Sequence, residues 1–177
     1  MTTADPSPLQ KLIAALEQSD TFLRQERAER IVWMSQYNQR PSVIMGSAEA
    51  LGVLGEAEAA FREGHFISVI LLAQALVEHE LVEELVHRQV ASYGVTLNQA
   101  LEAAKEHQVL ADELFERIHQ LRQLRNPFAH LKKPDHSHNF GNRYIARQIH
   151  PKVLLREDAE KAFKVMYEVF RALLRAV

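Results

Sequence analysis

Apolar side chains recur at helical spacing in one segment of this chain after another, and this repetition limits the fold more than any other feature. Near the start the stripe consists of Leu9, Leu12, Ile13 and Leu16, and near the end of Ala159, Phe163, Met166, Tyr167, Phe170 and Leu174. Glycine and proline are scarce, at six each among 177 residues, so few positions break a helix. No convincing set of strands and no internal repeat appears. The sequence therefore predicts an all-α fold, an up-and-down bundle of helices.

Start and stop signals divide the chain into candidate helices. Ser7 and Pro8 suit the opening of the first, and Ser19 or Asp20 can cap a second that runs to Asn38. Further helices are predicted over about 47–61, 66–92, 96–108, 112–125 and 156–176, with a loop over 132–152. Because Arg40-Pro41 marks a break, we expect an N-terminal helical extension over residues 1–46 and a bundle over residues 47–177.

Several features bear on where the protein acts. The chain has no cysteine, which excludes disulfides, thiolate metal sites and a cysteine nucleophile. Its start has no basic stretch followed by an apolar segment, so no secretory signal is visible. The longest apolar run, FISVILLAQALV, is too short to span a bilayer and is soon followed by Glu78 and Glu80. We expect a cytoplasmic protein that does not enter the membrane.

The formal net charge of −2 conceals a strong asymmetry. Residues 47–120 carry 13 acidic and 4 basic side chains, a net charge of −9. Residues 121–156 carry 8 basic side chains and one acidic one, Asp135, a net charge of +7. A local basic field favours a polyanionic ligand, although a solvated basic face is the ordinary alternative.

The stretch LRNPFAHLKK, residues 124–133, interrupts the helical pattern inside this basic region. Asn126-Pro127 resembles a helix start, so we expect one helix to end near Arg125 and a short new turn to begin at Asn126. Arg125 can bind a phosphate through two hydrogen bonds. Imidazole has an ordinary pKa of about 6.5, so His130 can exchange a proton near neutral pH. Such a pair suits metal-free phosphodiester cleavage, but a surface arginine and a partly buried histidine are the alternative.

The residues RNPFAH, 125–130, resemble the Arg-x4–6-His motif of the HEPN superfamily. The upstream stretch AEAAFREGHFISVILLAQALVEHELVEEL is similar to the leading helix pair of that family, so the resemblance covers about residues 47–177. It implies a homodimer whose two motifs face each other, and a metal-independent endoribonuclease that leaves a 2′,3′-cyclic phosphate. Such domains occur in defence and toxin–antitoxin systems, so an antidote protein is a possible partner.

The resemblance assigns roles to individual residues. His130 would be the acid/base group, Arg125 would bind the phosphate and stabilise its charge, and Asn126 would orient the histidine or the substrate. Glu78, or after it Glu80, would hold Arg125 in place. The tyrosine that marks the HepT branch is missing, because Lys132 stands two positions after His130. Many members of the superfamily lack catalysis, so a module that only binds RNA or protein remains the alternative.

Two further groups of residues lie beyond the motif. Lys132, Lys133, Arg143, Tyr144 and Arg147 are predicted to contact an RNA backbone or to stack on a base, with solvated charge as the alternative. His136, His138 and His150 raise the possibility of a metal site. No cysteine and no clear third ligand accompany them, so we expect neither a metal nor another cofactor.

Overall fold

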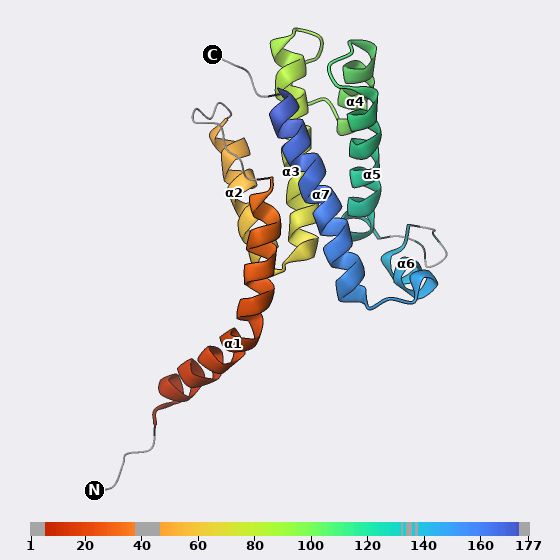
Figure 1. Cartoon of the computed structure of the whole chain (residues 1–177). Coiled ribbons are helices and arrows are strands. Elements are labelled where there is room, and N and C mark those ends of the chain that lie inside the picture. Colours follow the sequence, from red (N-terminus) through yellow and green to blue (C-terminus); the bar gives the residue numbers. More distant parts are fainter. Residues whose placement is uncertain (1–5, 38–46, 132, 134–135, 137, 174–177) are drawn as a thin grey trace, which may run out of the picture. The chain divides into compact units, whose positions relative to one another are not determined.

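The structure is a computed structural model that describes residues 6–37, 47–131, 133, 136 and 138–173. Every regular element in these residues is a helix, which confirms the predicted all-α class (Figure 1). The chain divides into two compact units, Met1–Gln39 and Arg40–Val177. The boundary predicted at residues 46 and 47 lies at the edge of residues 38–46, which are outside the described part.

The first unit consists of helix α1, Pro8–Ser35. As predicted, Ser7 caps it: the Ser7 hydroxyl accepts a hydrogen bond from the backbone N–H of Gln10. The predicted second helix start at Ser19-Asp20 is wrong, because the helix continues through both residues. The Asp20 carboxylate instead pairs with Arg24, one turn further along the same helix, at 3.2 Å.

The second unit begins with a helical hairpin. Helix α2 spans Ala48–Glu63, with Ser47 as its N-cap, and ends at Gly64, whose φ of 81° is left-handed. Helix α3 spans Phe66–His87, so it ends a few residues before the predicted end at about residue 92. Gln89 adopts a left-handed conformation with φ of 60°, and the N–H of Val90 bonds to the carbonyl of Leu85. This hydrogen-bond pattern closes the helix without a glycine.

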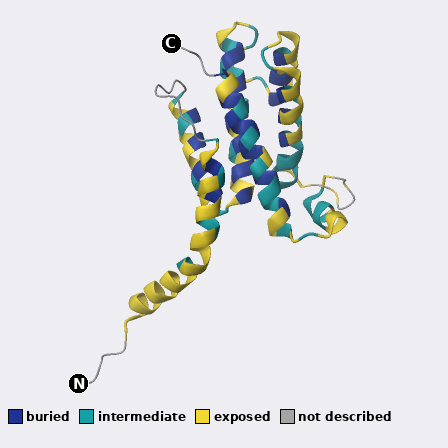
Figure 2. Cartoon of the chain, viewed as in Figure 1, coloured by how far each residue is buried: buried dark blue, intermediate teal, exposed yellow. Residues whose placement is uncertain are grey.

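Helix α3 is the centre of the second unit. It packs against α2, against α4, Leu97–Glu106, against α5, Asp112–Ala129, and against α7, Pro151–Leu173. It lies beside α7 in Figure 1. Figure 2 shows that buried residues, in dark blue, recur along these helices. The largest fully buried side chains include Phe61, Phe163, Ile70, Leu76, Leu81, Ile118, Leu154 and Met166. None of the described helices combines the length and the hydropathy that crossing a membrane needs.

Helices α4, Leu97–Glu106, and α5, Asp112–Ala129, form the side of the unit that carries the motif. The predicted break at Asn126 is wrong, because α5 runs through Pro127 and ends at His130. Pro127 lacks only the N–H that would bond to the Gln123 carbonyl, and it stands one turn from the helix end. The N–H of His130 still bonds to the Asn126 carbonyl, at 3.0 Å, and holds the last turn.

The predicted loop over residues 132–152 contains helix α6, Phe140–Arg147. Asn139 caps this helix by accepting a hydrogen bond from the N–H of Gly141. Two ion pairs join α6 to α7: Arg143 with the fully buried Asp158, at 2.7 and 2.8 Å, and Arg147 with Glu157. Each arginine binds its carboxylate with two hydrogen bonds. The helix is therefore held by contacts that its own short sequence does not reveal.

Candidate functional site

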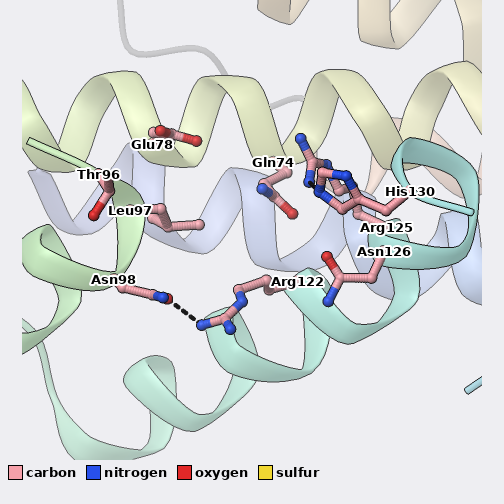
Figure 3. Close-up of a pocket in the computed structure, with 9 residues that line it drawn as sticks. All are labelled: Gln74, Glu78, Thr96, Leu97, Asn98, Arg122, Arg125, Asn126 and His130. Atoms are coloured by element: carbon pink, nitrogen blue, oxygen red, sulfur yellow. Dashed lines mark hydrogen bonds between the residues drawn. The ribbon is translucent and has the colours of Figure 1, made fainter. Parts of the chain in front are cut away.

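A cleft of about 500 Å³ lies among α3, α4 and α5 (Figure 3). Its lining residues are Gln74 and Glu78 from α3, Thr96, Leu97 and Asn98 at the start of α4, Arg122, Arg125 and Asn126 from α5, and His130. Four of the residues in this cleft are ones that the sequence singles out, namely Arg125, Asn126, His130 and Glu78. The motif and its predicted acidic neighbour therefore share one cavity.

Arg125 and His130 are in direct contact within this cleft. Nη1 of Arg125 lies 3.0 Å from Nε2 of His130. Because a guanidinium carries only N–H donors, Nε2 must accept the hydrogen bond, and the proton of the neutral ring is then on Nδ1. The imidazole thus offers one accepting nitrogen next to a permanent cation. This arrangement fits an acid/base group placed beside a charge stabiliser.

The backbone at the end of α5 explains this contact. Five residues along a continuous helix correspond to about 140° of rotation, which would point the two side chains apart. His130 leaves the helix with φ of −139° and ψ of 134°, so its side chain is not on the helical path. Phe128, two residues before it, contacts the ring of Phe140 at 5.6 Å between centroids, which joins the end of α5 to α6. The bend at His130 therefore does what we predicted for Asn126-Pro127.

Hydrogen-bond donors border the other side of the cleft. The Arg122 guanidinium donates to the side-chain oxygen of Asn98, which leaves most of its five N–H groups for other acceptors. Asn98 and Leu97 are the first residues of α4, where backbone N–H groups have no partner within the helix. The positive end of α4 and two guanidinium groups thus favour an anion in this cleft.

Two acidic residues were predicted to hold Arg125, and the structure separates them. Glu78 is half-buried and lines the cleft, whereas Glu80 is buried and does not line it. Residues two positions apart on a helix point to different faces, which explains the difference. The assignment of Glu78 as the residue that holds Arg125 stays a prediction. The carboxylate of Glu78 partly offsets the positive charge of the cleft.

Gln74 is a cleft residue that sequence reasoning missed. Only 5% of its surface is exposed, and its side-chain oxygen Oε1 has no hydrogen-bond partner among the described residues. Leaving such a group unpaired costs about 1–3 kcal/mol. The only signal in the sequence is a polar residue one turn before Glu78 in an otherwise apolar stretch of α3.

The residues predicted to contact RNA outside the motif lie on or near α6. Lys133 is exposed, and Lys132 lies outside the described residues. Arg143 and Arg147 bind carboxylates of α7, and Tyr144 packs on the ring of Phe140 with 5.5 Å between centroids. The pair with Glu157 raises the pKa of Arg147 and lowers that of Glu157, chiefly through their hydrogen bonds. Arg143, Tyr144 and Arg147 thus have structural roles, and the contact of all five residues with RNA stays a prediction.

Two of the three histidines noted in the sequence after α5 lie beside the motif. His136 and His138 line a smaller hollow of about 180 Å³ that shares Arg122 and Asn126 with the cleft and also includes His119. Within the part of the chain that the structure describes, the only group with metal-ligand spacing is His79, Glu80 and Glu83 on α3, where His79 pairs with Glu83 at 3.7 Å. The histidines after α5 therefore do not converge with a further ligand in the described residues.

No family model matches the chain, and no curated protein or solved structure is significantly similar to it.

Proposed function

We propose that this protein is a metal-independent endoribonuclease of the HEPN type. The observation that carries the proposal is the contact between Arg125 and His130 in a cleft bordered by Arg122 and the start of α4. The contact places a guanidinium and an imidazole 3.0 Å apart in a cavity that a ligand can enter, as acid/base catalysis at a phosphodiester requires. The geometry therefore favours catalysis over the binding module that the sequence left open.

The reaction is an internal transesterification of RNA. The 2′-oxygen attacks phosphorus, the P–O5′ bond breaks, and the products are a 2′,3′-cyclic phosphate and a 5′-hydroxyl. One proton must leave the 2′-hydroxyl and one must reach the 5′-oxygen, and imidazole suits both transfers. Arg125 stabilises the charge that develops on the phosphoryl oxygens, so no metal is required.

The hydrogen bond within the motif indicates how RNA would enter this site. Nε2 of His130 accepts from Arg125 and cannot take the proton of the 2′-hydroxyl at the same time. A phosphate is a better acceptor for a guanidinium than a neutral imidazole, because it is charged and can accept two hydrogen bonds. Binding of the scissile phosphate would thus draw Arg125 away and free Nε2 to act as the base.

A second copy of the chain would complete the reaction. Each protomer contributes one His130, while the transesterification uses both a base and an acid. In the homodimer that we propose, the two motifs face each other and the histidines divide these tasks. Asn126, which lines the cleft beside Arg125, would orient the substrate or the histidine.

Cleavage of a structured RNA in the presence of EDTA tests the proposal. We expect the wild-type protein to release fragments that end in a 2′,3′-cyclic phosphate, and His130→Ala to be at least 100-fold slower. His107→Ala removes an exposed histidine at the end of α4 and serves as the matched control. Equal cleavage by wild type and His130→Ala would point to a contaminating nuclease. RNA binding without any cleavage would support the non-catalytic module instead.

A further inference from the structure

The carboxamide of Gln74 occupies an unusual position in the cleft. Its neighbours on α3, Ala73 and Val77, are fully buried in the core, and Gln74 itself is 5% exposed. Figure 3 shows the Gln74 side chain pointing from α3 into the hollow that Arg125 and Asn126 line from α5. Gln74 is therefore part of the floor of the cleft, and Arg125 and His130 lie at its more exposed side.

The oxygen of this carboxamide lacks a partner. Oε1 of Gln74 is inaccessible to solvent and accepts no hydrogen bond from any described residue. An apolar side chain of similar length would fill the same space without an unsatisfied acceptor, so the folded protein gains nothing from the amide. The last torsion of a glutamine side chain is soft, so the carboxamide can turn and bring Oε1 to the surface of the cleft. A ligand that brings a hydrogen-bond donor there would satisfy it.

The chemistry of RNA restricts what this donor can be. Phosphate oxygens only accept hydrogen bonds, so the phosphate belongs with Arg125 and Arg122 and not with Oε1 of Gln74. The donors of RNA are the 2′-hydroxyl and the N–H groups of the bases. The proton of the 2′-hydroxyl goes to His130 in the proposed reaction, which leaves the base. A carboxamide presents an acceptor next to a donor, and this pair matches a base edge.

We propose that Gln74 is a specificity-determining residue that reads the edge of an unpaired nucleobase next to the scissile phosphate. The inference rests on the proposed function, because it takes RNA as the ligand. The cleft volume of about 500 Å³ falls within the range of small-ligand pockets. The base enters toward α3, its N–H donates to Oε1 of Gln74, and Asn126 faces it from α5. The protein should therefore prefer one base at this position.

Binding of uncleavable RNA tests this inference separately from catalysis. The probes are fluorescent 2′-O-methyl octamers of A, C or U, which have no 2′-hydroxyl donor. We expect the wild-type protein to bind one of them at least 10-fold more tightly than the weakest, consistent with one base-specific contact worth about 1.4 kcal/mol. Gln74→Met should bind all three within about 3-fold of one another. Gln120→Met, at an exposed position of α5, should keep the preference of the wild type.

Thermal unfolding gives a second test, because the change in Tm distinguishes a ligand-binding glutamine from a structural one. Gln74→Met should raise Tm, because it removes a buried acceptor without a partner, whereas a merely structural glutamine would lower Tm when replaced. If Gln74→Met does not fold, Gln74→Asn keeps the amide but shortens its reach, and it should also lose the base preference.

The outcomes separate the two proposals. Cleavage of RNA without any base preference, or a preference that survives in Gln74→Met, would overturn the role of Gln74 and leave the nuclease in place. No binding of any octamer would also overturn it. A preference that depends on Gln74 in a protein that never cleaves RNA would support the reading of the base and remove the nuclease.

Discussion

Nη1 of Arg125 donates a hydrogen bond to Nε2 of His130 over 3.0 Å, although five positions separate the two residues in the chain. The contact exists because His130 adopts an extended conformation directly after the last turn of α5. It joins a cation to a potential base, with Nε2 of the ring as the atom that faces the guanidinium. The predictions below follow from this pair and from the contacts that hold its surroundings.

Replacing the guanidinium should impair the reaction more than the fold. In Arg125→Lys the charge remains, but the ammonium cannot form two parallel hydrogen bonds with a phosphate. We expect the cleavage rate to fall about 100-fold, in the range seen when one charge-stabilising donor is removed, while Tm changes little. Single-turnover cleavage and thermal unfolding measure both. A rate within 3-fold of wild type would show that Arg125 does not stabilise the transition state.

Pro127 should be dispensable. The helix passes through this residue, so Pro127→Ala supplies a missing N–H to the Gln123 carbonyl and leaves the bend at His130 in place. Without the proline ring the unfolded chain has more conformational entropy, which destabilises the folded state by at most about 1 kcal/mol and opposes the stabilisation from the new hydrogen bond. We expect urea unfolding to show a loss of no more than about 1 kcal/mol, and cleavage within 3-fold of wild type. A complete loss of cleavage in a folded variant would mean that the proline itself shapes the site.

Arg143 should matter more for stability than Arg147. Arg143→Ala leaves the carboxylate of Asp158 buried, at 0% exposure, without its bidentate partner. Loss of one partner from a buried pair costs about 3–5 kcal/mol. Arg147→Ala removes an exposed pair with Glu157 and should cost much less. Urea unfolding of the two variants compares them, and equal losses would contradict the assigned burial of Asp158.

The ion pair between Arg147 and Glu157 should make the stability of the protein depend on pH. The hydrogen bond from Arg147 lowers the pKa of Glu157 below its ordinary value of 4.5. A group whose pKa is lower in the folded state stabilises it above the unfolded pKa, and this contribution disappears as the pH falls through the folded pKa. Glu157→Gln should therefore lower Tm at pH 6 and have a smaller effect at pH 3. An equal effect at both pH values would show that the pKa of Glu157 is not lowered by folding.

Much of the fold could be predicted from the sequence, because helix periodicity and caps are local signals. Ser7, Ser47 and Thr96 cap helices, and Gly64 ends one. One error occurred where tertiary contacts override such signals: ion pairs to α7 hold α6 in a stretch whose Asn, His and Gly content is typical of a loop. Another occurred at the end of α3, where Gln89 adopts a left-handed conformation that its residue type does not announce.

In the candidate site, too, some features could be predicted from the sequence and others only from the folded chain. The sequence identified Arg125, Asn126, His130 and Glu78, and the structure brings all four to one cleft. It placed the bend at the wrong residue, because Asn-Pro is a strong local signal for a helix start, whereas the extended conformation of His130 has no such signal. Gln74 could not be identified, because its importance lies in a missing hydrogen bond that only the folded chain reveals.

The most direct test of the central claim is a double-mutant cycle on RNA cleavage in EDTA with Arg125→Ala, His130→Ala and the double variant. If the two residues act as one unit on the same phosphodiester, the double variant should be about as slow as the slower single variant. Losses that multiply would show that Arg125 and His130 act independently, and wild-type rates in both single variants would contradict the account.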